Sequence, residues 1–180
     1  MSQKKIKVAT CSLAGCFGCH MSFLDMDERI VGLIDHIHFD RSPLTDIKTL
    51  GKCDIGLIEG GLCNEDNVEI ARRFREQCTL VVAVGACAIN GGVPALRNHY
   101  TVQECLEESY LNGLGVVDPQ IPSDPELPSL LPQVLAIQTA VEVDYFLPGC
   151  PPPADAFFEI LSALMEQREP QLDYAVRRFD

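Results

Sequence analysis

Short apolar runs that alternate with amphipathic segments constrain the fold of this chain more than any other feature. We predict strands at 6–11, 37–39, 54–58, 80–84 and 141–147, and helices at 25–34, 64–77, 101–111 and 155–167. Strands and helices in alternation indicate an α/β domain with a mostly parallel sheet. The run at 80–84 (LVVAV) is apolar throughout, which is typical of a doubly wound sheet with helices on both faces.

Capping residues and prolines mark where some of these elements begin and end. Asn64, followed by two acidic residues, is a predicted helix cap, and Thr101-x-x-Glu104 forms a predicted capping box. The segment 116–132 contains five prolines, at 119, 122, 125, 128 and 132. Because proline lacks an N–H, we predict neither a regular helix nor a central strand there. We expect a long surface excursion, and long loops of this kind are often functional or face a partner.

Length and charge limit the class of protein. A chain of 180 residues is long enough for one domain with its own core, so we predict a single domain over 1–180 with a tail at 170–180. The net charge is −12, from 26 acidic and 14 basic residues, which argues against binding to nucleic acid or anionic lipid. We find no signal peptide and no run of about 20 apolar residues that would cross a membrane. We therefore expect a cytoplasmic protein.

The cysteines give the strongest indication of function. Nine are present, at 11, 16, 19, 53, 63, 78, 87, 105 and 150, and an odd number in a cytosolic chain disfavours a disulfide framework. Cys16 and Cys19 follow the first predicted strand, Cys87 follows the strand at 80–84, and Cys150 follows the last one. Carboxyl ends of parallel strands share one edge, where ligands bind, so these four thiols should converge. Four thiolates at one point would repel unless a cation or a cluster neutralised them.

The spacing of these four cysteines favours an iron–sulfur cluster over zinc. Structural zinc sites use two close pairs, whereas here one C-x-x-C pair is joined by two single cysteines more than 60 residues apart. Neighbouring glycines allow the backbone to approach a bulky inorganic group, and a proline after Cys150 occurs in some iron–sulfur motifs. A thioredoxin-like C-x-x-C would leave Cys87 and Cys150 without a role. Zinc stays the alternative metal.

Other polar residues near this edge have two interpretations each. His20 would hydrogen-bond a cluster sulfur or a partner, or it is a solvated or capping histidine. Glu59 would relay protons or bind a partner, or it is a polar residue at a strand end. The remaining cysteines are interpreted as small buried residues, although Cys63 also lies at the strand-exit edge; they are Cys11, Cys53, Cys63, Cys78 and Cys105. No Walker A, G-x-G-x-x-G or G-x-S-x-G motif supports a nucleotide or hydrolase site.

The segment 15–25 (GCFGCHMSFLD) resembles the small subunit of nickel–iron hydrogenases. The resemblance continues through Glu59-Gly60, Gly85-Ala86-Cys87 and the PGCPP sequence at 148–152, so it spans nearly the whole chain. The related quinone-reductase subunit of respiratory complex I has adjacent cysteines in place of C-x-x-C and is the poorer match. Within the family, the chain is most similar to the short small subunit of the cytoplasmic bidirectional, NAD-reducing hydrogenase.

This resemblance implies a flavodoxin-like fold and one proximal 4Fe–4S cluster on Cys16, Cys19, Cys87 and Cys150. It implies no catalytic residue in this chain, because hydrogen is split at the nickel–iron site of a large partner subunit. Electrons would pass through the cluster to diaphorase subunits that hold iron–sulfur centres, FMN and NAD. Many relatives carry Glu where this chain has Gly15, so a proton route through that carboxylate is not predicted.

Several alternatives remain at this point. The chain would also fit another cytoplasmic nickel–iron hydrogenase, a complex I-type module or a zinc-stabilised α/β scaffold. An independent flavodoxin-like FMN reductase would bind flavin without a partner. An FMN in this chain stays open as a disfavoured addition, because the cysteine loop occupies the place of a phosphate-binding loop after the first strand.

Overall fold

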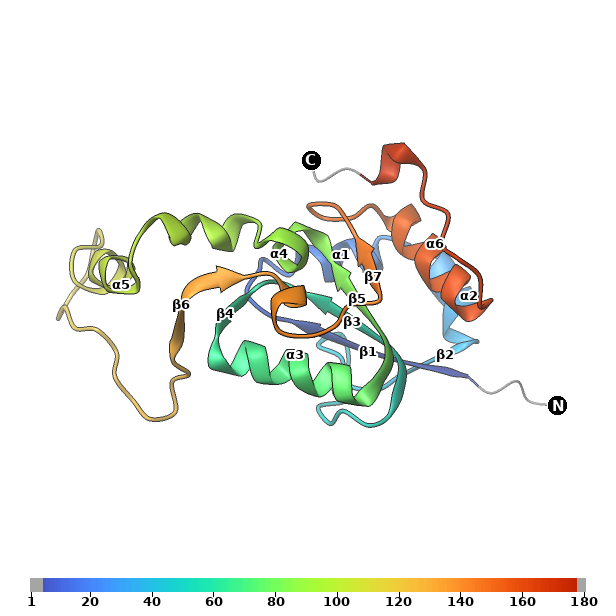
Figure 1. Ribbon diagram of the computed structural model, residues 1–180, viewed down its shortest axis with the longest axis horizontal. Helices are drawn as coiled ribbons and strands as arrows, with labels where there is room; N and C mark the ends of the chain where they lie inside the picture. The colour runs from blue at the N-terminus through green and yellow to red at the C-terminus, as the bar shows by residue number, and fades with distance from the viewer. Residues whose placement is uncertain (1–4, 178–180) are drawn as a thin grey trace.

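A five-stranded parallel sheet forms the centre of the computed structural model, which describes residues 5–177 (Figure 1). The strands are β1 (Ile6–Ser12), β2 (Ile37–Phe39), β3 (Cys53–Glu59), β5 (Cys78–Val84) and β7 (Tyr145–Leu147), in the order β2-β1-β3-β5-β7. Counted in chain order, this is the 2-1-3-4-5 arrangement of flavodoxin-like folds. The parallel register places Ser12 beside Glu59, Glu59 beside Val84 and Val84 beside Leu147, so four strands end at one edge.

Helices α1 (Gly18–Leu24), α2 (Arg29–Ile34) and α6 (Ala154–Met165) cover one face of the sheet. Phe23 of α1 and Phe157 of α6 meet edge to face, with ring centroids 5.7 Å apart, above Val82 and Val84. Each fully buried aromatic side chain contributes roughly 1.5–3 kcal/mol by leaving water. This core fixes α1, and with it the cysteine loop that precedes it.

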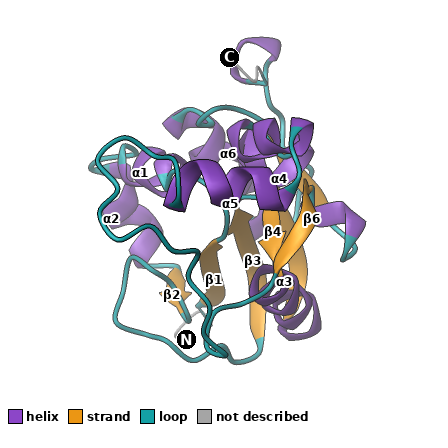
Figure 2. Cartoon of the chain, turned by 90° about the vertical axis from the view of Figure 1, so that its left-hand side faces the viewer, coloured by secondary structure: helices purple, strands orange, loops and turns teal. Residues whose placement is uncertain are grey.

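Helices α3 (Glu65–Gln77) and α4 (Gly85–Asn90) cover the opposite face, as Figure 2 shows for α3 relative to α1 and α2. Phe74 of α3 packs in this core with Val81 and Ala83, which alternate along β5 with the residues of the first core. The Asn64 side chain accepts a hydrogen bond from the Asn67 N–H at 2.9 Å, which confirms the predicted cap. The predicted doubly wound α/β fold is therefore confirmed.

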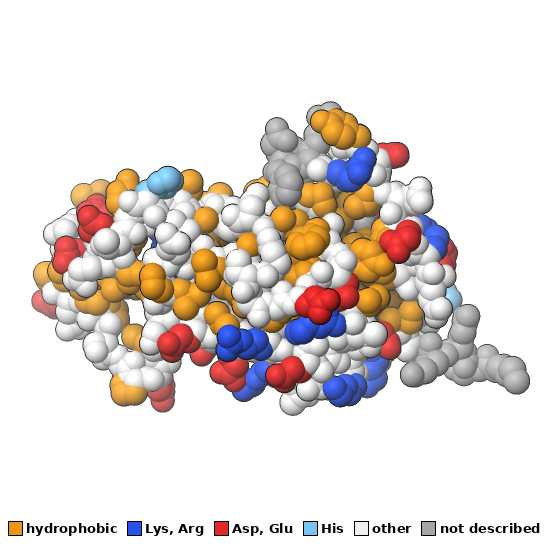
Figure 3. Space-filling model, viewed as in Figure 1, with side chains coloured by type: hydrophobic (Ala, Val, Ile, Leu, Met, Phe, Trp, Pro, Cys, Tyr) orange, Lys and Arg blue, Asp and Glu red, His pale blue; other side chains and the backbone are white. Residues whose placement is uncertain are grey.

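An arm extends from the sheet after α4. It comprises the 3-10 helix η1 (Val93–His99), α5 (Val102–Tyr110), a long loop and β6 (Leu130–Leu135), which pairs antiparallel with β4 (Leu62–Asn64). The predicted capping box at Thr101 and Glu104 is present, but α5 contains no buried residue. Figure 1 shows α5 at the end of the molecule farthest from α6, and Figure 3 shows apolar side chains spread over this end.

The structure corrects several predicted boundaries. The helix predicted at 25–34 begins at Arg29, after the unpredicted α1, and the strand predicted at 141–147 is limited to β7. The helix predicted at 155–167 covers Ala154–Met165. The predicted excursion 116–132 overlaps β6 at its last three residues, where Pro132 is tolerated because β6 is an edge strand.

The C-terminal tail contains a short 3-10 helix η3 (Tyr174–Val176), and η2 (Ile137–Thr139) packs in the second core. Between residues 5 and 177, no helix combines the length and the apolar character that crossing a bilayer requires.

Candidate metal centre

Three loops at the carboxyl edge of the sheet bring together the four predicted ligands. Cys16 and Cys19 follow β1, with Cys19 in the first turn of α1; Cys87 lies in α4 after β5, and Cys150 follows β7. Cys16 and Cys150 are exposed, whereas Cys19 and Cys87 are partly buried. All four lie on one side of the molecule, because the parallel strands that precede them end at the same edge of the sheet.

The C-x-x-C loop has an unusual backbone conformation at its centre. Phe17 has φ +67°, a left-handed conformation that side chains with a Cβ rarely adopt. This turn lets the Gly18 N–H donate to Cys16 Sγ at 3.3 Å, and it starts α1 so that the Cys19 thiol faces the Val84 carbonyl at 3.9 Å. The backbone N–H of Gly18 is therefore already directed at a thiol.

Backbone hydrogen bonds tie the cysteine loops to one another. The Ala86 N–H donates to the Gly149 carbonyl at 2.8 Å, which joins the loops of Cys87 and Cys150. Ala14 and Gly61 exchange two backbone hydrogen bonds, of 2.8 and 3.1 Å, which hold the Cys16 loop against the end of β3. The loops therefore form one connected rim.

Two glycines leave room for the thiols of Cys19 and Cys87 next to the backbone of this rim. Gly85 has φ +80°, and a Cβ there would collide with Cys19 Sγ. Gly92 has φ +48°, and a Cβ there would lie 2.8 Å from Cys87 Sγ. A side chain at either position would occupy space that a cysteine uses, so the site is built for close backbone approach.

The thiols are close enough to influence one another electrostatically. Burial raises the pKa of Cys19 well above its usual value, and the negative charges of Glu59, Cys87 and Cys16 raise it further. Burial also raises the pKa of Cys87, as do Cys150 and Cys16, against the lowering effect of the Val93 N–H. Both raised pKa values favour the neutral thiol at Cys19 and Cys87, and a positively charged inorganic core would reverse that preference.

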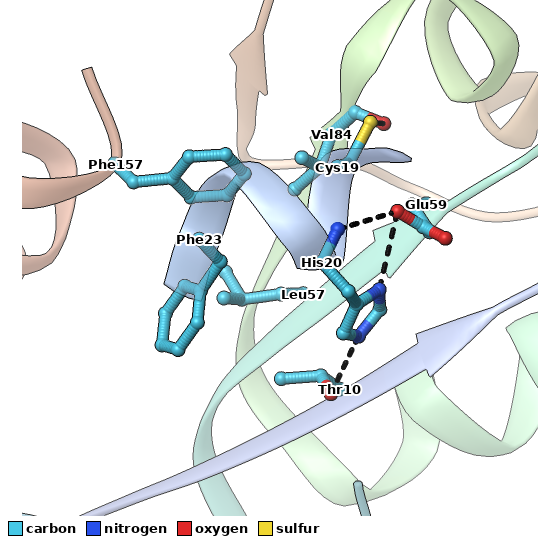
Figure 4. A pocket seen from close by; sticks show the side chains of 8 residues that line it. All are labelled: Thr10, Cys19, His20, Phe23, Leu57, Glu59, Val84 and Phe157. Carbon is cyan, nitrogen blue, oxygen red and sulfur yellow. Dashed lines mark hydrogen bonds and ion pairs between the residues drawn. The ribbon is translucent and has the colours of Figure 1, made fainter. Parts of the chain in front are cut away.

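Glu59, at the end of the central strand β3, lines the same small pocket as Cys19 (Figure 4). It is 3 % exposed and accepts hydrogen bonds from Ser12 Oγ at 2.6 Å and from the His20 N–H at 2.9 Å. Burial alone would raise the pKa of Glu59, but hydrogen bonding from His20 and Ser12 outweighs it and lowers this pKa. The negative charge of this carboxylate in turn raises the pKa of the Cys19 thiol.

His20 is buried and is neither solvated nor directed at a sulfur. Its Nε2 lies 2.8 Å from Thr10 Oγ1, and its Nδ1 lies 3.1 Å from Glu59 Oε2, although the ring does not align an N–H with that oxygen. Three further polar residues contact Glu59, His20 or one another, and sequence analysis did not predict them: Thr10, Ser12 and Ser42. The one sequence signal for such a contact was the polar Thr10 among the apolar residues of β1.

The other five cysteines lie away from this rim or make separate contacts. Cys53 and Cys78 are paired across β3 and β5 at the opposite edge of the sheet, and Cys63 Sγ contacts Asn67 Oδ1 at 3.2 Å. All nine cysteines fall within residues 5–177 and all are free thiols. Within the same residues, no three His, Cys, Asp or Glu side chains close tightly enough around one point to hold a single metal ion.

Comparisons with known proteins identify the family of this chain. Residues 16–164 match the family of the NADH ubiquinone oxidoreductase 20 kDa subunit. The chain is 44 % identical to the delta subunit of the NAD-reducing hydrogenase HoxS from Cupriavidus necator, covering 98 % of this chain and 86 % of the relative. It is 36 % identical over 94 % of its length to one subunit of the F420-non-reducing hydrogenase from Methanothermobacter marburgensis, but spans only 56 % of that relative.

Solved structures give the same result. A chain in the crystal structure of an NAD+-reducing [NiFe]-hydrogenase in the H2-reduced state superimposes with a TM-score of 0.96 at 52 % identity, covering 98 % of this chain and all of that one. A chain of the [NiFeSe]-hydrogenase of Dm. baculatum shares the fold alone, with a TM-score of 0.59 at 20 % identity. The chain therefore belongs to the family of the NADH ubiquinone oxidoreductase 20 kDa subunit, and within it to the small subunits of the NAD-reducing nickel–iron hydrogenases.

Proposed function

We propose that this chain binds one 4Fe–4S cluster through Cys16, Cys19, Cys87 and Cys150 and relays electrons through it within an NAD-reducing hydrogenase. The observation that carries this proposal is the convergence of four thiols from three loops at one edge of the sheet. A donor set made only of cysteine sulfur suits iron–sulfur clusters or zinc. Membership of a hydrogenase family supports the first of these.

The sequence spacing of the cysteines also supports a cluster over zinc. One C-x-x-C pair with two distant single cysteines differs from the two close pairs that structural zinc sites use. A core of four irons and four sulfides is larger than one ion, and the glycines beside Cys19 and Cys87 leave the backbone clear of it.

The residues around the thiols prepare the site for one-electron transfer, which is the chemistry that a 4Fe–4S cluster supplies when bound. Phe23, Val84 and Phe157 line the small apolar pocket behind Cys19, which keeps water from that ligand (Figure 4). Gly18 offers an N–H to Cys16 Sγ, and hydrogen bonds to cysteine sulfur raise a cluster's reduction potential. Glu59 and His20 lie directly behind the ligands.

The exposure of Cys16 and Cys150 supports a partner over this edge. In our proposal the partner is a large subunit with the nickel–iron site, where hydrogen is oxidised. Diaphorase subunits with iron–sulfur centres, FMN and NAD receive the electrons. The complex lies in the cytoplasm, with residues 1–180 of this chain as one domain and 170–180 as its tail.

Single Cys→Ser variants of the hydrogenase complex test the ligand set. Changes at 16, 19, 87 and 150 should each reduce iron and acid-labile sulfide and alter the EPR spectrum of the dithionite-reduced complex. Cys53→Ser, Cys78→Ser and Cys105→Ser are matched controls that should retain the wild-type spectrum, because they lie outside the rim. Equal losses in both groups would contradict the assignment. Zinc without iron in the wild-type complex would overturn the electron-transfer proposal.

A further inference from the structure

A continuous chain of polar contacts runs from the cysteine rim into the core. The Ser12 hydroxyl and the His20 N–H hold Glu59, the His20 ring contacts Thr10 Oγ1 at 2.8 Å, and Thr10 Oγ1 lies 2.8 Å from Ser42 Oγ. Thr10, Ser42 and His20 are 2 %, 1 % and 6 % exposed, and Glu59 is 3 % exposed. Burying four polar side chains is costly unless they are bonded to one another, so such groups fix a unique arrangement.

The His20 ring in this chain of contacts also touches the loop between two proposed ligands. The ring of Phe17 stacks on the ring of His20, with centroids 4.7 Å apart and planes within 3°. Phe17 lies between Cys16 and Cys19 and has the left-handed φ of +67° described above. That conformation is unfavourable for a residue with a Cβ, so contacts around it must hold it in place. The flat stack on a buried imidazole is the contact suited to do so.

The position of His20 is set from the sheet. Thr10 is on β1, which pairs with β2 and β3, and the register places Thr10 beside Leu57. The Thr10 side chain is 2 % exposed and its hydroxyl is also hydrogen-bonded with Ser42 Oγ, so packing and this bond hold the hydroxyl in place. The imidazole that it orients therefore presents one fixed face to Phe17, while the Glu59 carboxylate fixes the backbone N–H of the same residue.

We propose that His20, oriented by Thr10, is a positioning residue for the metal centre that holds the Cys16–Cys19 loop in its ligating conformation through Phe17. This inference rests on the proposed cluster, and it assigns His20 no contact with a sulfur. The imidazole contributes two separable properties, a flat ring for Phe17 and a nitrogen for Thr10. Side chains that keep only one of these properties therefore provide the test.

The experiment uses the complete hydrogenase complex with substitutions at Thr10 and His20. Thr10→Val removes the hydroxyl at nearly constant shape, and Thr10→Ser retains it. We expect Thr10→Val to broaden or shift the EPR signal of the reduced cluster and to accelerate iron loss to a chelator by about tenfold, as outer-shell changes do. Thr10→Ser should restore the wild-type spectrum. His20→Phe keeps the ring and His20→Gln keeps a nitrogen, and each should show a partial effect.

The exposed His36 provides the control, since His36→Gln should leave the spectrum and the iron loss unchanged. If His20→Phe does not fold, the Thr10 pair alone decides the question. Full iron content with a wild-type spectrum and wild-type iron loss in Thr10→Val and in the folded His20 variants would overturn the inference while the proposed function stands. A wild-type complex without iron would instead refute the proposed function.

Discussion

Gly85 combines a backbone conformation that favours glycine with direct contact to a cysteine of the candidate metal centre. It begins α4 with φ +80°, and a Cβ there would collide with Cys19 Sγ and lie 3.4 Å from the Gly149 carbonyl oxygen. Three loops of the rim therefore meet at a position that admits only hydrogen. The glycine is required both by its own φ and by a thiol from another part of the chain.

We predict that Gly85→Ala removes iron from the complex without unfolding the sheet. The added methyl group would displace the Cys19 thiol, while both cores beneath the rim stay unchanged. Iron and sulfide analysis measures the loss, and far-UV circular dichroism checks the fold.

Gly32→Ala is the matched control for Gly85→Ala. Gly32 lies in α2, and a Cβ there would have no neighbour within 4 Å. We expect full iron content and a stability gain of roughly 0.5–1 kcal/mol from reduced backbone entropy. Wild-type iron content in Gly85→Ala would contradict the close approach of Cys19.

At the scale of elements, Glu159 of α6 holds the segment that follows the helix in place through hydrogen bonds. It pairs with Arg168 through both carboxylate oxygens, at 2.6 and 3.0 Å, and accepts the Gln171 N–H at 2.7 Å. Hydrogen bonding from Arg168, and then from Gln171, lowers the pKa of Glu159 to about 2. Because this pKa is lower in the folded chain, the carboxylate stabilises the segment above pH of about 4.5 and loses that effect as pH falls toward 2.

We therefore predict that Glu159→Gln exposes residues 168–171 to hydrogen exchange at neutral pH while the global melting temperature changes little. The pair lies at the surface and is screened by water, so its effect should be local. Hydrogen exchange with mass spectrometry measures the segment directly. The wild-type segment should lose protection on acidification from about pH 4.5 to about pH 2, and the variant should show no such step. Equal protection in both proteins would refute this role of Glu159.

The elements that sequence analysis predicted correctly are those with strong local signals. The cap at Asn64 and the capping box at Thr101 each satisfy an N–H within three residues, so they are readable from sequence. The pairing of β4 with β6 joins Leu62 to Leu135, which no local pattern indicates. Helix α4 has six residues and begins with glycine, so its intrinsic helix propensity is low. Packing against β5 and β7 stabilises it instead, and this packing is not visible in the local sequence.

At the scale of the whole molecule, the predicted convergence of the cysteines followed from topology. Parallel strands of a doubly wound sheet end on one side, so loops after β1, β5 and β7 had to share an edge. The contacts behind that edge were not predictable, because His20 meets Thr10 only when α1 packs on the sheet. A histidine after a C-x-x-C pair gives no sequence signal for a partner ten residues earlier on a strand.

The two cores also predict how the chain responds when its metal is removed. Both are built on alternating faces of β1, β3 and β5, and neither includes Cys16, Cys87 or Cys150. The rim is held by backbone hydrogen bonds between loops and by small residues, with little apolar burial of its own. A bound cluster would therefore stabilise the rim most strongly, since a ligand stabilises the state that binds it.

We predict that removing iron from the complex with a chelator under reducing conditions leaves the sheet folded. Amides of the strand centres should keep their protection in hydrogen exchange, whereas residues 13–20, 85–92 and 148–152 should lose theirs. The melting temperature should fall and then recover when iron and sulfide are restored. Loss of protection throughout β1, β3 and β5 would mean that the metal is needed to form the core, as in a small zinc domain. A chain with two apolar cores of this size should instead fold its sheet without the metal. The cysteine loops of the rim should then become ordered when the cluster binds.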